Sequence, residues 1–199
     1  MNDKKKYDSK ELLRPGNMLR LYASGAFPMA EENGIINWFM PEVRTIIPLD
    51  KFNIPRSLKS YIKHSGFEFK FDTDFLAVVK GCASRDKTWI SDELIEAYLR
   101  LYKRGHIHTV ETWQNNKLVG GLYGVTFRGA FFGESMFSKV SQASKAALAK
   151  LIEHLNEKDF VLLDVQYMTL HLKMFGAVEI DFEEYNKLLY SSYTRVCEF

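Results

Sequence analysis

The stretch HTVETWQNNKLVGGLYGVTFRGAFFG, residues 108–133, decides the fold of this 199-residue chain. It contains two strand-like runs, His108–Gln114 and Lys117–Phe127, separated by a pair of asparagines. Asparagine tolerates the left-handed backbone of a two-residue hairpin turn, so the pair predicts a hairpin. A second turn at Arg128-Gly129 leads into a third strand over Ala130–Gly133. This stretch therefore predicts an antiparallel sheet at the centre of the protein.

The residues after this stretch predict a helix, a strand and a short helix. Apolar residues recur at helical spacing over residues 141–157, and Phe160–Gln166 is a run typical of a buried strand. A short helix over Thr169–Phe175 is expected to end at Gly176. Hairpins followed by a strand–helix–strand unit predict an α/β (α+β) fold around a mixed sheet.

The N-terminal part predicts a small domain of its own. Residues 9–24 have a helical pattern that Pro15-Gly16 should interrupt. We place a domain boundary near Pro41, which gives a small N-terminal domain over 1–40 and a catalytic domain over 41–199. The elements expected between this boundary and the hairpin are strands at 44–49 and 67–71 and helices at 55–64, 74–82 and 91–104.

Composition predicts a cytoplasmic protein without a membrane segment. No apolar run approaches the roughly 18 residues that span a bilayer, and the charged start MNDKKK lacks the apolar core of a signal peptide. The net charge is only +2, so any contact with RNA must come from a local basic patch. Nothing in the sequence indicates a coiled coil or an internal repeat, so a monomer is expected.

Three polar residues in apolar surroundings are candidates for chemistry. Asp164 and Gln166 are two positions apart, so on a strand their side chains face the same way. The aspartate could accept from the glutamine NH2 and leave the glutamine carbonyl to hold an amine N–H. Glu134 follows an aromatic strand and a glycine, where a carboxylate could bind a cationic amine. The structural alternatives are a polar pair that caps the next helix and a surface glutamate.

The sequence offers little for a metal or a cofactor. His106 and His108 could share a strand face, but no third ligand lies near them in the sequence. Cys82 and Cys197 lack the context of a nucleophile, and a disulfide is not expected in a reducing compartment. The loop over 133–141 has no second glycine, so it lacks the G-x-G backbone that cradles a pyrophosphate. We therefore expect neither a metal nor a cofactor.

Two sets of residues could contact a nucleic acid. Arg56, Lys59 and Lys63 lie three to four positions apart and form one basic stripe on a helix, which could bind phosphates. The ordinary structural explanation for such a stripe is a solvated helix face. The ordinary explanation for large aromatic residues is packing in the hydrophobic core. The aromatic candidates for stacking on a base are Tyr22, Trp38 and Trp89.

Several motifs occur in an order and at a spacing that is specific. The two most informative are LVGGLYGV at 118–125 and FGESMFS at 132–138. The others are Tyr22-x-x-Gly25-x-Phe27-Pro28, Trp38-x-x-Pro41-x-x-Arg44, Arg56-Ser57-Leu58, Thr88-Trp89-Ile90, Val110-Glu111-x-Trp113, Ala143-Ser144-Lys145, Asp164-x-Gln166, and Thr169-x-His171-Leu172 with Gly176-Ala177. Together they cover residues 19–178, and the chain resembles the bacterial leucyl/phenylalanyl-tRNA–protein transferase family.

This resemblance implies a GNAT-like acyltransferase domain after the small N-terminal domain. It implies an enzyme that moves Leu or Phe, and less readily Met, from aminoacyl-tRNA to the α-amine of proteins beginning with Lys or Arg. The product would be a degradation signal of the bacterial N-end rule pathway. The missing pyrophosphate cradle agrees with a tRNA ester as the acyl donor.

The resemblance also implies roles for individual residues. Asp164 and Gln166 match the catalytic pair of the family, and Glu134 matches an acidic substrate-binding residue. Tyr22 and Trp89 match positions near the terminal adenosine of the donor. The positions that match the lining of the aminoacyl pocket are Leu122, Met136, Leu148, Leu151 and Leu163.

Two departures from the family pattern bear on tRNA affinity. Met29 stands where tryptophan often contacts the adenosine, and a thioether stacks less well than an indole. Ser60 and His64 stand where cations can extend the basic stripe. Both departures are expected to weaken tRNA binding and to leave the catalytic pair untouched.

Other functions share part of this pattern. A coenzyme-A-dependent N-acyltransferase would share the architecture, although the missing cradle argues against it. A non-catalytic tRNA-binding module would bind tRNA without using Asp164 and Gln166. A related transferase that selects acceptors beginning with Asp or Glu would share the chemistry, but its motifs fit this chain less well.

Overall fold

The computed structural model describes residues 9–85 and 88–199. Its strands are β1 Phe27–Ala30, β2 Ile36–Phe39, β3 Val43–Ile46, β4 Glu68–Phe71, β5 Ile107–Gln114, β6 Lys117–Phe127, β7 Ala130–Ser138, β8 Leu162–Gln166 and β9 Val178–Asp181. Its helices are α1 Ser9–Leu12, α2 Pro15–Ala23, α3 Arg56–His64, α4 Phe75–Ala83, α5 Asp92–Tyr102, α6 Ala143–Glu157, α7 Leu170–Lys173 and α8 Phe182–Tyr193.

The strands form one seven-stranded sheet and one two-stranded ribbon. The order in the large sheet is β4-β5-β6-β7-β8-β3-β9, and the ribbon pairs β1 with β2. Within the large sheet β7 and β8 run parallel, whereas the other neighbouring strands are antiparallel. The expected α/β fold with a mixed sheet is therefore confirmed.

Local sequence explains several element boundaries. Asn115 and Asn116 have φ values of 51° and 59°, which is the left-handed backbone that the β5–β6 hairpin turn requires. The hydroxyl of Ser91 accepts from the backbone N–H of Leu94 and caps α5, as its position predicts. Pro15 occupies the first turn of α2, so the expected interruption of the N-terminal helix is confirmed.

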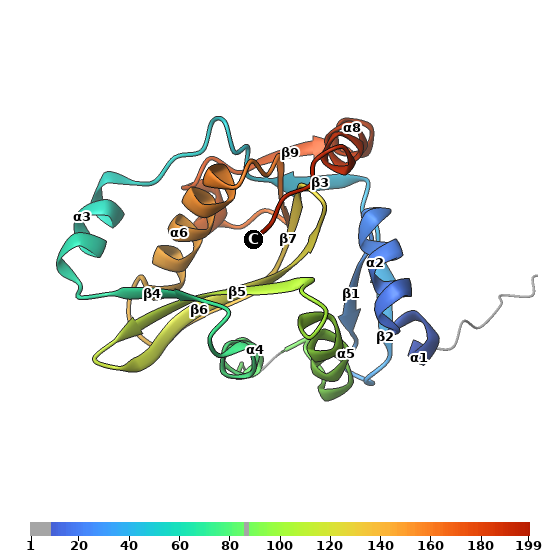
Figure 1. Cartoon of the computed structure of the whole chain (residues 1–199), viewed down its shortest axis with the longest axis horizontal. Helices are drawn as coiled ribbons and strands as arrows, with labels where there is room; N and C mark the ends of the chain where they lie inside the picture. Colours follow the sequence, from blue (N-terminus) through green and yellow to red (C-terminus); the bar gives the residue numbers. More distant parts are fainter. Residues whose placement is uncertain (1–8, 86–87) are drawn as a thin grey trace, which may run out of the picture.

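Helices cover both faces of the large sheet, as Figure 1 shows, with α3 and α6 on one side and α4 and α5 on the other. The apolar cluster that contains α6 packs around Leu148 and Ile152, and the cluster on the opposite face packs around Tyr98 and Phe132. No helix within residues 9–85 and 88–199 is both long and apolar enough to cross a membrane. The division of the chain at residues 40 and 41 stays a prediction.

Three parts of the fold differ from the sequence-based expectation. β7 continues to Ser138 instead of ending at Gly133, because the polar residues beyond the glycine remain paired with β6. β1 begins at Phe27, where no strand was expected. β9 and α8 follow Gly176, and no element was expected there.

Candidate active site

A cavity of about 590 Å³ opens where β7 and β8 separate. The two strands pair only as far as Phe132 on β7 and Asp164 on β8. Beyond this point the cavity is lined by Gly133 on one strand and Val165 and Gln166 on the other. Separation of two parallel strands therefore creates a pocket in the middle of the sheet.

The pocket wall is mostly apolar. Leu148 and Leu151 reach it from α6, so the helix that covers this face of the sheet also closes the pocket. The five lining residues expected from the sequence all contribute to this wall, namely Leu122, Met136, Leu148, Leu151 and Leu163. Their role in holding an aminoacyl side chain stays a prediction.

A bulge in β7 brings a carboxylate into the pocket. Tyr123 of β6 pairs with Ser135, whereas the next residue, Gly124, pairs with Gly133. Glu134 is the extra residue between these two pairs, and such bulges re-aim side chains next to functional sites. The sequence predicted Glu134 at the end of a strand, whereas the structure places it inside β7 and lining the pocket.

The Glu134 carboxylate is buried and held by hydroxyl groups. The residue is 7% exposed; Tyr22 donates to Oε1 at 2.9 Å and Tyr98 donates to Oε2 at 2.7 Å. Burial raises the pKa of Glu134 to about 7, although the two tyrosine hydroxyls act in the opposite direction. The carboxyl group can therefore gain or lose a proton near neutral pH.

Gln166 and Asp164 are close, but they interact differently from the expectation. The carboxamide Nε2 of Gln166 lies 3.4 Å from Oε1 of Glu134, so Glu134 and not Asp164 accepts from the NH2 group. The backbone N–H of Gln166 donates to Oδ1 of Asp164 at 2.9 Å. Arg44 forms a buried ion pair with Asp164, with Nη2 2.6 Å from Oδ2. The prediction that the Asp164 carboxylate accepts from the Gln166 carboxamide is wrong, because the Gln166 side chain points towards Glu134.

The residues expected near the donor adenosine lie in different environments. Trp89 is half-buried and lines the pocket. Tyr22 is fully buried, and its hydroxyl contacts Glu134 and Tyr98, so we revise its role from stacking to holding the carboxylate. Met29 on β1 packs against the hydrophobic cluster that contains Tyr98 and Phe132, and it is not among the residues that line the pocket.

The three residues of the basic stripe do not line the pocket. Arg56, Lys59 and Lys63 lie on α3, and all three side chains are exposed. In Figure 1 this helix lies at the end of the molecule opposite to α2, beyond α6. The helix packs against α6, since its Leu58 belongs to the same apolar cluster as the pocket-lining residues Leu148 and Leu151.

The residues that might hold a metal do not form a cluster. His108 pairs with Asp72, with Nδ1 2.7 Å from Oδ2, and within residues 9–85 and 88–199 no group of three possible metal ligands is found. Both cysteines are free, and burial raises the pKa of the Cys82 thiol to about 12. The thiolate that nucleophilic chemistry requires is therefore disfavoured at Cys82.

The loop before α6 uses its amides inside the protein. The N–H groups of Lys139 and Val140 both donate to the carbonyl of Val119, and that of Ser144, in the first turn of α6, donates to the hydroxyl of Ser138. Gly120 serves packing, since a Cβ there would lie 2.5 Å from the Cβ of Ala143 at the start of α6. These observations argue against a coenzyme A cradle in this loop.

Sequence reasoning missed the partners of the polar trio. Tyr98 and Tyr185 look like ordinary core aromatics in sequence, and their hydroxyls donate to Glu134 and Asp164. Arg44 was noticed only as part of a motif. An arginine within an apolar strand pattern is a usable signal, because a buried guanidinium requires an acidic partner.

Comparisons with known proteins agree with these features. A family model described as leucyl/phenylalanyl-tRNA protein transferase matches residues 46–190, and the model of the N-terminal domain of the same family matches residues 11–42. A leucyl/phenylalanyl-tRNA–protein transferase of Herpetosiphon aurantiacus is 49% identical over 178 residues, which are 89% of this chain and 93% of that protein. The fold, the pocket and these matches together define a transferase.

The family is shown by the extent of these matches. The chain belongs to the leucyl/phenylalanyl-tRNA–protein transferase family, since the two models cover most of its length and the curated relative is nearly half identical. The family assignment suggested by the sequence motifs is confirmed.

Two solved structures show a more distant likeness. L-PGS from Bacillus licheniformis aligns with 78% of this chain at 15% identity and a TM-score of 0.46, and the chain spans 51% of that structure. The C-terminal domain of a putative lysylphosphatidylglycerol synthetase from Agrobacterium fabrum aligns with 79% of this chain at 10% identity and a TM-score of 0.43, covering 60% of that structure. At this level the likeness carries no argument about the activity.

Proposed function

We propose that this chain moves Leu or Phe, and less readily Met, from aminoacyl-tRNA to the α-amine of proteins that begin with Lys or Arg. The observation that carries the proposal is the apolar pocket with Glu134 and Gln166 in its wall. Such a pocket suits an uncharged side chain attached to an amine and an ester carbonyl. Membership in the family supports the same reaction.

The shape of the pocket would select the donor. Leu122, Met136 and Leu163 offer apolar surface to an unbranched or γ-branched side chain. Exclusion of β-branched Ile and Val would rest on shape, which gains only about 1–3 kcal/mol per methyl-sized difference. Selection among apolar amino acids should therefore be good but not absolute.

The proposed chemistry is aminolysis of an ester. The acceptor α-amine attacks the aminoacyl carbonyl carbon, the C–O bond to the tRNA ribose breaks, and the ribose oxygen leaves with a proton. An α-amine has a pKa of about 7.7–8.0, so a useful fraction is neutral at pH 7 and no strong base is required. Positioning of the reactants could supply roughly 7–11 kcal/mol of the barrier.

The polar residues would orient this reaction. The Gln166 NH2 group donates to Glu134, which leaves the carboxamide oxygen to accept an N–H of the attacking amine. Glu134 would anchor an amine of the donor or of the acceptor. An amide is too weak a base to keep the proton, so a ribose hydroxyl or a water would complete its transfer.

Further expectations follow from the family and remain part of this proposal. The sheet with its separating parallel strands suits a GNAT-like domain, preceded by a small N-terminal domain over 1–40. The reaction would take place in the cytoplasm, with the chain acting as a monomer and without a cofactor. The product would be a degradation signal of the N-end rule pathway.

The test is transfer of radiolabelled Leu from Leu-tRNA to a peptide beginning with Arg, with a peptide beginning with Ala as control. Label on the Arg peptide alone is the expected result. Gln166→Ala should lose most of this activity, whereas Gln114→Ala removes a carboxamide that bonds Ser65 outside the pocket and should retain it. Binding of tRNA without label on either peptide would instead indicate a tRNA-binding module.

A further inference from the structure

The carboxylate of Asp164 lies at the centre of a buried network. Nε of Arg44 lies 3.0 Å from both carboxylate oxygens, and Nη2 lies 2.6 Å from Oδ2. The hydroxyl of Tyr185 on α8 donates to Oδ2 at 2.8 Å, and the N–H of Gln166 donates to Oδ1 at 2.9 Å. Asp164 and Arg44 are both 0% exposed. Because protein donors occupy the acceptor positions of the carboxylate, a substrate has little access to it.

Arg44 is fixed by aromatic rings on two sides. Its guanidinium carbon lies 4.6 Å from the ring centroid of Phe27 on β1 and 4.8 Å from that of Tyr185. Gly25 makes this packing possible, since a Cβ there would lie 2.8 Å from Cε1 of Tyr185. The N-terminal ribbon and the C-terminal helix therefore meet at the ion pair, although neither lines the pocket near Gln166.

The network ends on a residue with an unusual backbone. Gln166 has a φ of 65°, a left-handed conformation that is unfavourable for a residue with a Cβ. The residue pairs with Thr45 of β3, whereas Asp164 pairs with the next residue, Ile46, so the ladder is irregular at this point. The bond from its N–H to Asp164 holds the turn, and the turn directs the carboxamide to Glu134.

We infer that Arg44 and Tyr185 are positioning residues for the transfer reaction. Through Asp164 they hold the left-handed backbone of Gln166 and thereby set the direction of its carboxamide. Asp164 acts through its bond to the backbone N–H, and its charge is balanced by Arg44. This inference rests on the proposed function, because it assigns these residues to the same reacting site.

Tyr185→Phe tests the inference with the smallest change. It removes the hydroxyl donor to Asp164 and keeps the ring that packs against Arg44. We expect kcat for Leu transfer to an Arg-starting peptide to fall about tenfold, because the carboxamide loses its fixed direction. KM for Leu-tRNA and for the peptide should stay within about twofold, since the pocket wall is unchanged. Tyr190→Phe on the same helix changes an exposed ring and should keep wild-type kcat.

Amide hydrogen exchange gives a second readout that does not depend on turnover. The Gln166 amide should exchange faster in Tyr185→Phe than in the wild type. The Ile47 amide follows β3 directly and donates to the Leu163 carbonyl of β8 at 2.9 Å, and it should exchange at its wild-type rate. A general loss of stability would accelerate both amides, so the comparison separates local positioning from global unfolding.

The outcomes separate failure of this inference from failure of the proposed function. A lower kcat with unchanged KM, together with faster exchange at Gln166 alone, supports the positioning role. If the wild type is active and Tyr185→Phe has the same kcat, the inference is overturned and the proposed function remains in place. A wild type that transfers Leu to neither peptide overturns the proposed function, and the inference with it.

Discussion

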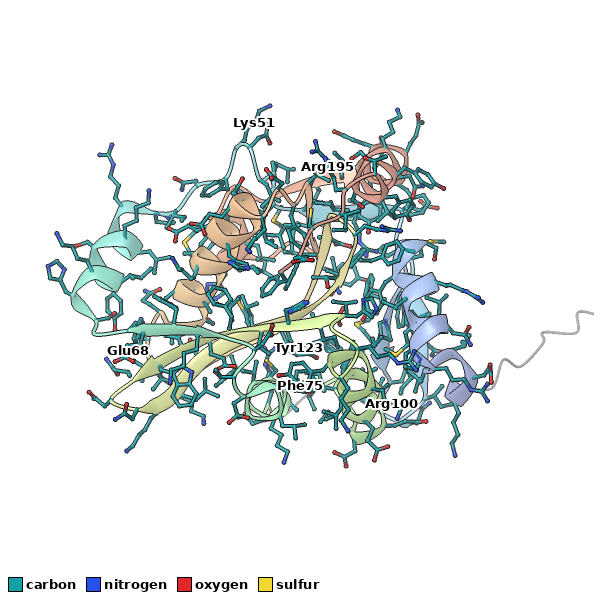
Figure 2. The ribbon with its side chains drawn as sticks, in the orientation of Figure 1. Lys51, Glu68, Phe75, Arg100, Tyr123 and Arg195 are labelled. Carbon is teal, nitrogen blue, oxygen red and sulfur yellow. The ribbon has the colours of Figure 1, made fainter. Side chains whose placement is uncertain are left out.

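The hydroxyl of Tyr98 lies 2.7 Å from Oε2 of Glu134, and both residues are buried. A residue of α5 thus acts across the interface between helix and sheet to lower the pKa of a carboxyl group on β7, against the larger effect of burial, which raises it. Figure 2 shows Tyr123 on the same side of the sheet, near Phe75 of α4, with the two ring centroids 6.4 Å apart. The Tyr98 ring lies 5.5 Å from that of Tyr123, so Glu134 contacts one end of a group of packed tyrosines.

The first prediction concerns pH. The pKa of Glu134 is raised to about 7, so its ionised fraction, and with it transfer activity, should increase between about pH 6 and pH 8. The Tyr98 hydroxyl stabilises the ionised form, so Tyr98→Phe should raise this pKa and move the rising limb to higher pH. The measurement is the pH profile of kcat with one peptide.

Tyr102→Phe on the same helix is the matched control for this profile. Its hydroxyl donates to the carbonyl of Asp72, away from Glu134, so the profile should stay at the wild-type position. An identical shift in both variants would contradict the role of Tyr98.

The second prediction concerns the choice of donor. Met136→Ala should enlarge the pocket and raise the ratio of Phe to Leu transfer by about tenfold, and at most by about 200-fold, since one side-chain-sized difference is worth about 1–3 kcal/mol. Competition between Phe-tRNA and Leu-tRNA measures this ratio directly. Met174→Ala alters a methionine that does not line the pocket and should leave the ratio unchanged.

The third prediction concerns the body of the tRNA. Replacing Arg56, Lys59 and Lys63 together by Ser should raise KM for Leu-tRNA. The slope of log KM against log salt concentration should fall by about 2–3, because each lost phosphate contact removes about 0.7–0.9 from that slope. The same variant should use leucyl-adenosine, which lacks the tRNA body, as well as the wild type does. Serine at Lys80, Lys103 and Arg104, which are exposed on α4 and just after α5, is the charge-matched control. Equal loss in both triple variants would mean that α3 holds no specific contact.

The fourth prediction concerns stability. The buried carboxylate of Glu111 accepts from the hydroxyl and the N–H of Thr73, from the N–H of Asp74 and from Nε1 of Trp113. Burial acts to raise its pKa, but these donors outweigh burial and lower the pKa below its usual value. Glu111→Gln places an NH2 group against the same donors and should cost about 1–3 kcal/mol of unfolding free energy.

The pH dependence of this loss has a defined sign. A carboxyl group with a lowered folded pKa stabilises the protein fully above its unfolded pKa, near 4.3, and loses that contribution as the pH falls through the folded value. Urea denaturation should therefore show a lower free energy of unfolding for Glu111→Gln than for the wild type at pH 7. This difference in free energy should become smaller under acid conditions. Glu96→Gln, an exposed change on α5, should show no such difference at either pH.

The sequence was sufficient where short-range patterns determine the structure. The two asparagines at 115 and 116 identified the β5–β6 hairpin, and the spacing of Leu148, Leu151 and Ile152 identified α6 as a packed helix. The family motifs also named the five apolar residues that the structure places around one pocket. These features rest on neighbours in sequence or on matched positions, so one chain was enough to find them.

Long-range partners could not be read from the sequence. Asp164 was expected to hold the Gln166 side chain, but Arg44, 120 positions away, and Tyr185 occupy its carboxylate. The one-residue bulge at Glu134 has no reliable sequence signature. The residues before it and the residues after it each alternate between the two faces in a regular way, so neither segment shows where the extra residue lies. The assignment of β1, β9 and α8 failed for a related reason, since their burial depends on packing against distant segments.

The bulge at Glu134 also shifts the phase of everything that follows it in β7. Phe131 belongs to the apolar cluster on the α6 face and Phe132 to the opposite cluster. Strict alternation from Phe132 would send Met136 towards α4 and Phe137 towards α6, but the extra residue reverses both, and Met136 lines the pocket. Deleting a single residue between positions 133 and 135 would exchange these two side chains. The number of residues in one strand thus decides which of these two pocket-lining side chains faces α6 and which faces α4.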